Sequence, residues 1–500
     1  MTQLNSFDMA CPIDSRYYGA DSQFFERLKP YVSEEAYIRY QGQIEIALAE
    51  VLVEWGKAPP TLIKEIKEAC QKITAKEVYQ EEERIGHIVR AFVNCIRNRI
   101  SEESRPFVHL FATSNDVTDT ATTLRFKELT RDILLPDLIS LEKVLISLAR
   151  KHADSIQIGR THGKHAEPIT FGFAMANYVA RLGNRLESID KARKNLRGKF
   201  SGAVGGYNAL SLIHPNDPEI FEMEILSKLG LKPTDTQIST QIVHPEYITD
   251  LVHSVVSTFS VIANLADDIR HLHRSEIAET QEIYSKEQVG SSTMPHKLNP
   301  KNFEFVKSMW KAFMPRMMTV YMDQISEHQR DLTNSASGRF VSELFTGFIY
   351  SVHRLTAALK RLHVDVEAMQ RNLKSTNCEE ILAEPLYIVL SLNGHPDGHK
   401  ATQELIAEAR ATKTSLAELI WKKEDIRSYL KNLSPEQRLI LEQPYKYTGA
   451  TKQRTTATCD FWEMVCDSIK EALIAETKSS RYEEGKQEGR AYSESSAIGF

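Results

Sequence analysis

The sequence lacks several features that would assign it to a specialised class of protein. Its six cysteines never form a CxxC pair, so we expect reduced thiols and no disulfide framework or zinc ribbon. We find no apolar run near the roughly 18 residues that a membrane-spanning helix needs, and the acidic opening has no signal-peptide core. The formal net charge of -5 leaves no basic footprint for nucleic acid or an anionic membrane. These absences favour a cytoplasmic protein that binds neither nucleic acid nor membrane.

Helical periodicity dominates what the sequence does contain. The 500 residues are 42% hydrophobic, 26% charged and 8% aromatic, which is typical of a globular protein. Apolar residues recur at steps of 3 and 4 over four long stretches, about 127–156, 167–199, 245–277 and 300–330. Such lengths favour a bundle of long helices, so we predict an all-α fold. The clearest apolar stripes are Leu138, Leu141, Leu145 and Leu148, and then Met175, Val179, Leu182, Leu186 and Ile189.

The breaks between these stretches suggest how the chain is divided. We expect an N-terminal helical domain over 1–111, a central long-helix domain over 112–364 and a C-terminal domain of shorter helices over 365–478. The last stretch, 479–500, is rich in Glu, Lys, Gly and Ser, and we expect it to be disordered. The polar segment 278–300 is longer than a helix connection in a bundle needs, and such loops often carry function.

Three polar segments interrupt the apolar pattern and supply groups for chemistry: VHLFATSNDVTDT at 108–120, IGRTHGKHAEP at 158–168 and VGSSTMPHKLNPKNFE at 289–304. Each also has a purely structural interpretation. Thr-Ser-Asn-Asp is a common helix N-cap, Gly-Ser-Ser is a common turn, and His162 with His165 would need further ligands to hold zinc. Together, however, their hydroxyls, histidines, lysine and glutamate suit an anionic substrate that must lose a proton.

These segments also resemble motifs of the adenylosuccinate lyase family, within the fumarase/aspartase superfamily. The loop GSSTMPHKLNP at 290–300 is similar to the long and specific superfamily motif GSSxMPxKxNP. Two shorter segments also resemble family motifs: GRTHGKHAEP is similar to RTHxxxAxP, and residues 108–116 are similar to the TSxD segment. In the same way, FSGAVGGY at 200–207 resembles the GAVG turn, and TQIVHPEYITDL at 240–251 resembles a helix start that contains TQ. The resemblance implies an all-α fold of three domains and a homotetramer whose active sites are each built from three subunits.

The same resemblance implies a role for each matched residue. Ser291 would be the general base and His162 the general acid, and Glu304 would pair with His162. Lys297 and Asn299 would hold the succinyl carboxylate that gains charge. The matched residues that would assist in binding the substrate are Thr113, Ser114, Asn115, Asp116, Thr161, Gln241 and Ser292. No metal or organic cofactor is needed for any of these steps.

A further set of matched residues would bind the nucleotide. Arg16 and Tyr17 lie in PIDSRYYG, which is similar to the family's PxDGRY opening. The run RDLTNSASGR at 330–339 resembles RDLxxSxxxR and implies that Arg330, Ser335 and Arg339 contact the nucleotide, the last two at its phosphate. His87 also matches a substrate contact, but Ile88 replaces the Asp that usually follows it. Arginine suits phosphate because it offers a forked and permanently charged donor.

The expected activity is therefore a carbon–nitrogen (amidine) lyase reaction that releases fumarate from adenylosuccinate and from the related imidazole-carboxamide ribotide. One alternative is a lyase for another fumarate adduct, such as argininosuccinate or malate, but these substrates carry no phosphate for Arg339 to bind. Another alternative is a non-catalytic structural relative. The presence of Ser291, His162, Lys297, Asn299 and Glu304 argues against it.

Overall fold

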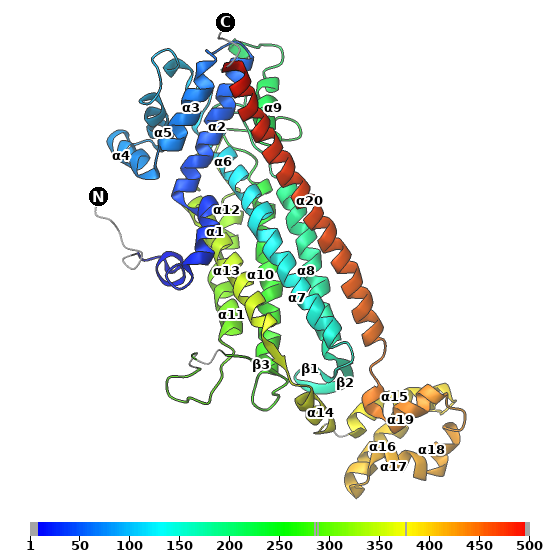
Figure 1. Cartoon of the computed structure of the whole chain (residues 1–500). Coiled ribbons are helices and arrows are strands. Elements are labelled where there is room, and N and C mark those ends of the chain that lie inside the picture. The colour runs from blue at the N-terminus through cyan, green and yellow to red at the C-terminus, as the bar shows by residue number, and fades with distance from the viewer. Residues whose placement is uncertain (1–8, 285–286, 288–289, 376–377, 496–500) are drawn as a thin grey trace.

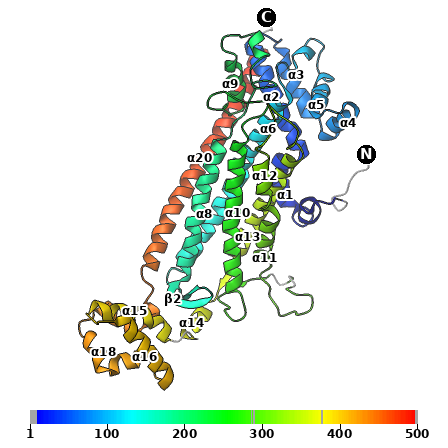
Figure 2. The same ribbon diagram turned by 180° about the vertical axis from the view of Figure 1, so that it is seen from behind.

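The computed structural model describes residues 9–284, 287, 290–375 and 378–495 (Figure 1). A bundle of long helices forms its centre, and the apolar stripes expected from the sequence are buried in the core of that bundle. Helix α20 packs along α7 and α8, and Figure 2 shows it beside α8 from behind. The all-α prediction is confirmed. The bundle helices are α7 (Leu135–Lys151), α8 (Phe171–Lys194), α10 (Glu246–Leu272), α11 (Lys301–Phe313), α13 (Val341–Lys360) and α20 (Thr451–Ser495).

Local sequence explains where these helices begin and end. The expected stretch 300–330 divides into α11 and α12 (Arg316–Met322) because Pro315 stands between them. Helix α8 approaches α20 closely at Gly183, where a Cβ atom would lie 2.2 Å from the Trp462 ring. By length and composition alone, helix α10 is apolar enough to cross a membrane. That window is 67% buried, as expected of a core helix.

One end of the bundle carries the N-terminal helices. Helices α2 to α5 enclose a small core of their own, whereas α1 packs into the core of the main bundle. Helix α2 also packs against α6 and α9. The bounds are η2 (Ile13–Tyr17), α1 (Ser22–Val32), α2 (Glu34–Glu54), α3 (Thr61–Lys72), α4 (Ala75–Ile85), α5 (Ile88–Arg97), η3 (Arg105–Phe107), α6 (Ser114–Leu129), η4 (Thr130–Leu134), η5 (Leu210–Leu212) and α9 (Glu219–Lys228).

Two small antiparallel sheets lie at the other end of the bundle (Figure 1). Neither sheet was expected from the sequence. Strand β1 pairs with β2 as a hairpin, and β3 pairs with β4 after a long separation in sequence. The bounds are β1 (Ile156–Thr161), β2 (Lys164–Thr170), β3 (Thr280–Glu282) and β4 (Leu362–Val364), and η6 (Ser337–Phe340) precedes α13 at the opposite end.

The C-terminal part differs from the expected division of the chain. A separate apolar core is formed by helices α15 to α19, whereas α20 joins the core of the central bundle. The tail that we expected to be disordered from Ser479 continues α20 as far as Ser495, because its Glu, Lys, Gln, Arg and Ala residues favour a helix that has already begun. Residues 496–500 lie outside the described residues. The remaining bounds are α14 (Val366–Ser375), α15 (Cys378–Leu392), α16 (Gly398–Thr412), α17 (Leu416–Lys422), α18 (Glu424–Tyr429), α19 (Pro435–Glu442) and η7 (Pro444–Lys446).

Candidate functional site

Most of the residues expected in the active site lie on segments that fall into two groups at opposite ends of the bundle (Figure 1). The start of α6, the Gln241 segment and the 323–340 segment lie at the end that carries the N-terminal helices. The β1–β2 hairpin and the 290–300 loop lie at the other end. Helix α10 connects the two ends through 27 residues, which corresponds to about 40 Å at 1.5 Å per residue. A single chain therefore cannot bring both groups around one small substrate.

The Ser291 side chain is the best-defined feature of the 290–300 loop. Its hydroxyl oxygen accepts hydrogen bonds from the backbone N–H of Thr293 at 3.3 Å and of Met294 at 3.1 Å. Two N–H dipoles directed at one oxygen stabilise negative charge on it. Such an environment favours the alkoxide that a serine base requires.

The rest of the loop is held by backbone contacts. The Asn299 amide donates to the Gly290 carbonyl at 3.1 Å, and the Tyr284 hydroxyl donates to the Asn299 carbonyl. Gly290 passes so close to Lys297 that a Cβ atom would lie 2.1 Å from the Lys297 carbonyl oxygen. Only glycine fits there. The side chains of Lys297 and Ser292 are exposed. Four residues of the polar segment 278–300, namely 285, 286, 288 and 289, lie outside the described residues.

His162 lies at the tip of the β1–β2 hairpin. Thr161 pairs with Lys164, so His162 and Gly163 form a two-residue turn, and both have positive φ angles of 51° and 72°. This is the turn geometry that suits the twist of a hairpin. The imidazole of His162 is exposed, as is Thr161, and makes no hydrogen bond within the described residues. The turn thus presents an unpartnered imidazole to solvent.

Buried ion pairing fixes the hairpin to the bundle. Arg160 forms an ion pair with Glu279 at 2.7 Å, and Gln157 donates to the same carboxylate at 2.6 Å. Asn372 of α14 donates to it at 2.8 Å. Glu279 is fully buried, so these partners compensate the cost of removing its charge from water. The buried contacts of Glu279 therefore hold the hairpin, and with it His162, in a fixed position.

Glu304 differs from the sequence expectation. The resemblance implied that Glu304 pairs with His162, but its side chain in the first turn of α11 is exposed, because that turn lies at the end of the bundle. Among the described residues of one chain, no hydrogen bond or ion pair joins Glu304 to His162. The pairing of Glu304 with His162 stays a prediction, and it needs a second chain or a movement of the loop.

The start of α6 is organised by Asp116. One Asp116 oxygen accepts the Thr113 backbone N–H at 2.8 Å in a capping box. The other forms an ion pair with Lys199 and accepts the Ser201 N–H at 3.1 Å. Asp116 is fully buried, so it holds the Thr-Ser-Asn segment against the 200–207 turn and has no surface left for a substrate. Thr113 and Ser114 keep partial exposure.

Asn115, Gln241 and Arg330 lie near one another beside this helix start. The Asn115 amide donates to Asp119 at 3.3 Å, and Asp119 also accepts the Val243 N–H, two residues after Gln241. The Gln241 N–H donates to the Gln329 carbonyl at 3.3 Å, next to Arg330. The Arg330 Nε atom is buried and has no hydrogen-bond partner in the described part of the chain. These contacts bring three of the expected substrate-binding residues together.

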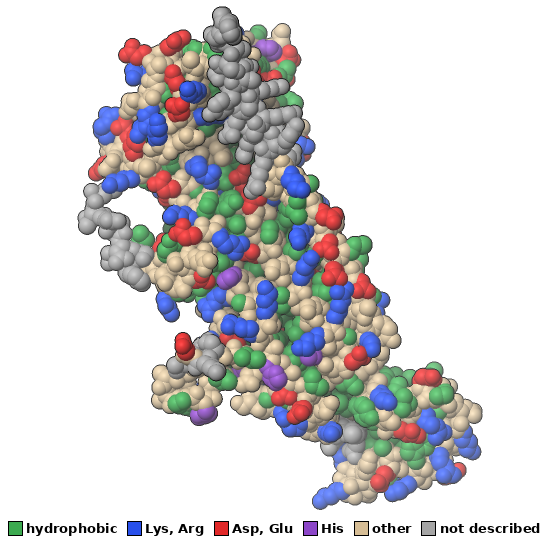
Figure 3. Space-filling view, in the orientation of Figure 1, with side chains coloured by type: hydrophobic (Ala, Val, Ile, Leu, Met, Phe, Trp, Pro, Cys, Tyr) green, Lys and Arg blue, Asp and Glu red, His purple; other side chains and the backbone are tan. Residues whose placement is uncertain are grey.

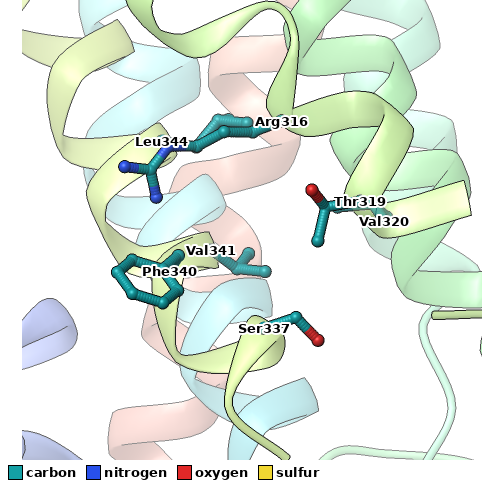
Figure 4. Close-up of a pocket in the computed structure, with 7 residues that line it drawn as sticks. All are labelled: Arg316, Thr319, Val320, Ser337, Phe340, Val341 and Leu344. Atoms are coloured by element: carbon teal, nitrogen blue, oxygen red, sulfur yellow. The ribbon is translucent and has the colours of Figure 1, made fainter. Parts of the chain in front are cut away.

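The 323–340 segment presents Ser335 and Arg339 to solvent. The Ser337 hydroxyl donates to Asp323 at 2.7 Å and holds the segment in place. A pocket of about 230 Å³ opens between α12, η6 and α13, lined by Arg316, Ser337, Phe340 and four further side chains (Figure 4). Arg316 is already paired with Glu343 at 2.8 Å. Arg339 is an exposed cation that lies in the sequence between the lining residues Ser337 and Phe340.

The remaining expected nucleotide contacts, Arg16, Tyr17 and His87, lie on other elements. Tyr17 in η2 packs edge-on against Phe305, and Arg16 beside it is exposed. His87 caps α5, and its Nδ1 atom accepts the Arg90 N–H at 3.2 Å. Ile88 replaces the aspartate that usually follows this histidine, and the bond from a backbone donor fixes the imidazole tautomer in its place.

Sequence reasoning missed His109. Its Nδ1 atom lies 2.6 Å from Oε1 of the buried Glu45, whose other oxygen accepts the His109 N–H at 3.1 Å. His109 and Phe111 both have positive φ angles, 62° and 67°, just before Thr113. The conspicuous VHLFATS sequence could have drawn attention to His109, but its partner lies 64 residues away.

Comparisons with known families match almost the whole chain. A model described as "Lyase" matches residues 15–313, and one described as "Adenylosuccinate lyase C-terminal" matches residues 326–439. An adenylosuccinate lyase of Pyrococcus abyssi is 32% identical over 461 residues, covering 89% of this chain and 99% of the relative. An adenylosuccinate lyase of Bacillus subtilis is 32% identical over 406 residues, covering 80% of this chain and 90% of the relative.

Solved structures with the same fold are more distant in sequence. A 3-carboxy-cis,cis-muconate lactonizing enzyme from Pseudomonas putida superposes with a TM-score of 0.77 at 22% identity, covering 88% of this chain and 97% of its own. A fumarate lyase from Mesorhizobium sp. BNC1 gives a TM-score of 0.75 at 21% identity, covering 87% and 97%. These likenesses establish the arrangement of the helices.

Proposed function

This chain belongs to the adenylosuccinate lyase family of the fumarase/aspartase superfamily, and from that premise we propose how its residues eliminate fumarate from a succinylated purine nucleotide. The substrates are adenylosuccinate, which gives AMP, and succinyl-aminoimidazole-carboxamide ribotide, which gives the free carboxamide. The enzyme is a carbon–nitrogen lyase of purine biosynthesis. We also propose that it acts in the cytoplasm without binding nucleic acid or membrane.

In the first step, the Ser291 alkoxide removes the proton from Cβ of the succinyl group. The electron pair left on Cβ delocalises into the adjacent carboxylate, which becomes a dianion. Lys297 and Asn299 neutralise and hydrogen-bond this carboxylate, with help from Thr113, Ser114 and Thr161. Preorganised donors at a developing oxyanion usually give the largest single contribution to catalysis.

In the second step, the carbon–nitrogen bond breaks and its electron pair goes to the purine nitrogen. His162 donates a proton to this leaving nitrogen, and the electron pair on Cβ forms the double bond of fumarate. A carboxylate beside an imidazole raises the pKa of its ring. Glu304 supplies that carboxylate from another chain or after the loop closes.

The distribution of these residues over both ends of the bundle calls for more than one chain. If a second bundle lies antiparallel to the first, the 290–300 loop of one chain meets the α6 start of its neighbour. Exposed apolar side chains in α12 and after it, Met318 at 62%, Ile325 at 77% and Leu332 at 80% exposure, support such packing. We propose a homotetramer whose active sites are each shared among subunits.

The nucleotide phosphate binds at the 323–340 segment. Arg339 and Ser335 are exposed there and offer a forked cation and a hydroxyl to phosphate oxygens. Arg330 of the same segment and Gln241, whose backbone N–H donates to the Gln329 carbonyl, also contact the nucleotide. Arg16, Tyr17 and His87 complete the nucleotide site from their own elements. A substrate without a phosphate would leave Arg339 without a partner.

The observation that carries this proposal is the pair of backbone N–H groups directed at the Ser291 oxygen. Purified protein should release fumarate, followed by its ultraviolet absorbance, from adenylosuccinate and not from argininosuccinate. Release from argininosuccinate alone would assign the chain to the other lyase, and release from neither would support the non-catalytic alternative.

A further inference from the structure

We propose that Asp119 is a positioning residue for the nucleotide substrate. In this role it joins the Gln241 segment to the start of α6 and supplies one of the negative charges near Arg330. The inference rests on the proposed function, because Gln241, Asn115 and Arg330 are its expected substrate contacts. Asp119 itself is not expected to touch the reacting atoms.

The hydrogen bonds of Asp119 connect two segments that are distant in the sequence. One carboxylate oxygen accepts the Val243 backbone N–H at 3.2 Å, across 124 residues of chain. The other accepts the Asn115 side-chain amide at 3.3 Å, one turn earlier on α6. The segment that contains Gln241 is thereby fixed relative to Asn115, and both side chains belong to the expected binding surface.

The charges around Asp119 come from several elements. Arg330 from the 323–340 segment and Lys199 from the segment after α8 favour its ionised form. Asp116 on the same helix opposes that form, and Tyr37 of α2 also faces Asp119. The Arg330 Nε atom is buried without a hydrogen-bond partner in the described part of the chain, and the carboxylates of Asp323 and Asp331 also lie within electrostatic range of this guanidinium.

The surroundings of Asp119 favour its protonated form over its ionised form. Removal from water outweighs the attraction of Arg330 and raises the pKa of Asp119 to about 6, from an ordinary value of 3.8. An acid whose pKa is raised in the folded state binds its proton more tightly there than in the unfolded chain. Ionisation of Asp119 therefore makes the fold less stable as the pH rises from about 4 toward 6 and above. If this position served only stability, a neutral side chain would stabilise the fold more than the ionised aspartate does.

This conflict gives a test that separates positioning from a structural role. In Asp119→Asn, the amide oxygen can still accept the Val243 N–H, but the charge facing Arg330 is gone. We expect the KM for adenylosuccinate and the Kd for AMP to rise about tenfold, because one negative charge near Arg330 is lost, with kcat changed much less. The thermal midpoint at pH 8 should be equal to or higher than that of the wild type.

Two further variants complete the test. Asp119→Glu keeps the charge and should restore part of the AMP affinity. Asp235→Asn, which removes an exposed partner of Arg197, should leave KM and Kd unchanged. The kcat/KM of the wild type should fall as the pH drops below about 6, and the part of that fall due to Asp119 should be absent in Asp119→Asn.

The outcomes separate this inference from the function on which it rests. If the wild type releases fumarate and binds AMP but Asp119→Asn does so with unchanged KM and Kd, the positioning role is wrong and the proposed function stands. A lower thermal midpoint at pH 8 together with a parallel fall in kcat would assign Asp119 a purely structural role. If the wild type neither binds AMP nor releases fumarate, the function and the inference fail together.

Discussion

The Ser291 hydroxyl oxygen accepts the backbone N–H of Met294 at 3.1 Å within the GSSTMPHKLNP loop. The donor is a main-chain group, so it is present whatever side chain occupies its position. The same loop needs Gly290 where it passes the Lys297 carbonyl. The backbone of the loop therefore positions donors toward the serine oxygen.

Ser291→Ala removes the oxygen and leaves the loop backbone in place. We expect kcat to fall by about 10²- to 10⁴-fold, the usual contribution of a positioned base, while the affinity for AMP stays the same. The matched control is Thr293→Ala, which retains the backbone N–H that points at Ser291. Steady-state fumarate release and calorimetric AMP binding measure both, and near-normal turnover in Ser291→Ala would remove it from the role of base.

His162 can be tested without disturbing its turn. Asparagine tolerates a positive φ angle well, so His162→Asn should keep the hairpin and its thermal midpoint while it loses the acid. We expect kcat to fall by about 10²-fold or more. His162→Ala should lose the same activity and also some stability. Activity that survives in His162→Asn would refute the assignment of the general acid.

Arg339 should affect binding more than chemistry. Arg339→Ala removes an exposed cation from the expected phosphate site, so the KM for adenylosuccinate should rise about 10-fold or more with a small change in kcat. Arg361→Ala, at the far end of α13, serves as the control. Steady-state kinetics at two salt concentrations measure both, and an unchanged KM would place the phosphate elsewhere.

Glu142 of α7 gives a prediction about stability. It is fully buried against Cys459 and Cys466 of α20, neither carboxylate oxygen has a partner in the described part of the chain, and burial raises its pKa well above 4.5. The folded state thus favours the protonated acid, and stability should fall as the pH rises above the unfolded value. Glu142→Met should raise the free energy of unfolding by about 1–3 kcal/mol at pH 8 and by less at pH 5.

Urea denaturation at both pH values measures this difference. Glu187→Met, at an exposed position on α8, should change stability little at either pH. If Glu142→Met destabilises the protein at pH 8, the buried carboxyl group contributes to stability and its description as an unpaired acid is wrong.

The long helices were predictable because their signal is local. The stripe from Leu138 to Leu148 repeats at helical spacing, and each of its leucines is buried. The β1–β2 hairpin was not predicted, because it depends on two positive φ angles at His162 and Gly163 and on the buried anchor at Glu279. The continuation of α20 was also missed, since composition alone suggested disorder.

The identities of the site residues could be expected from motifs, whereas their placement could not. Asp116 was expected to contact the substrate, yet four protein donors already surround it, including Lys199 across 83 residues. Pairs such as Asp119 with Val243, or His109 with Glu45, join positions with no periodic relationship in the sequence. Only the folded chain shows which of these side chains remain free.

The central claim is that one active site takes residues from opposite ends of different chains. Ser291→Ala and Gln241→Ala should each be nearly inactive, and subunits of the two variants should be mixed and allowed to exchange. About a quarter of the sites would then receive an intact residue from each chain and regain activity. A mixture of Ser291→Ala with Lys297→Ala should stay inactive, because both residues come from one loop. Recovery in the first mixture alone is the predicted result. No recovery there, with subunit exchange verified by native mass spectrometry, would contradict the account.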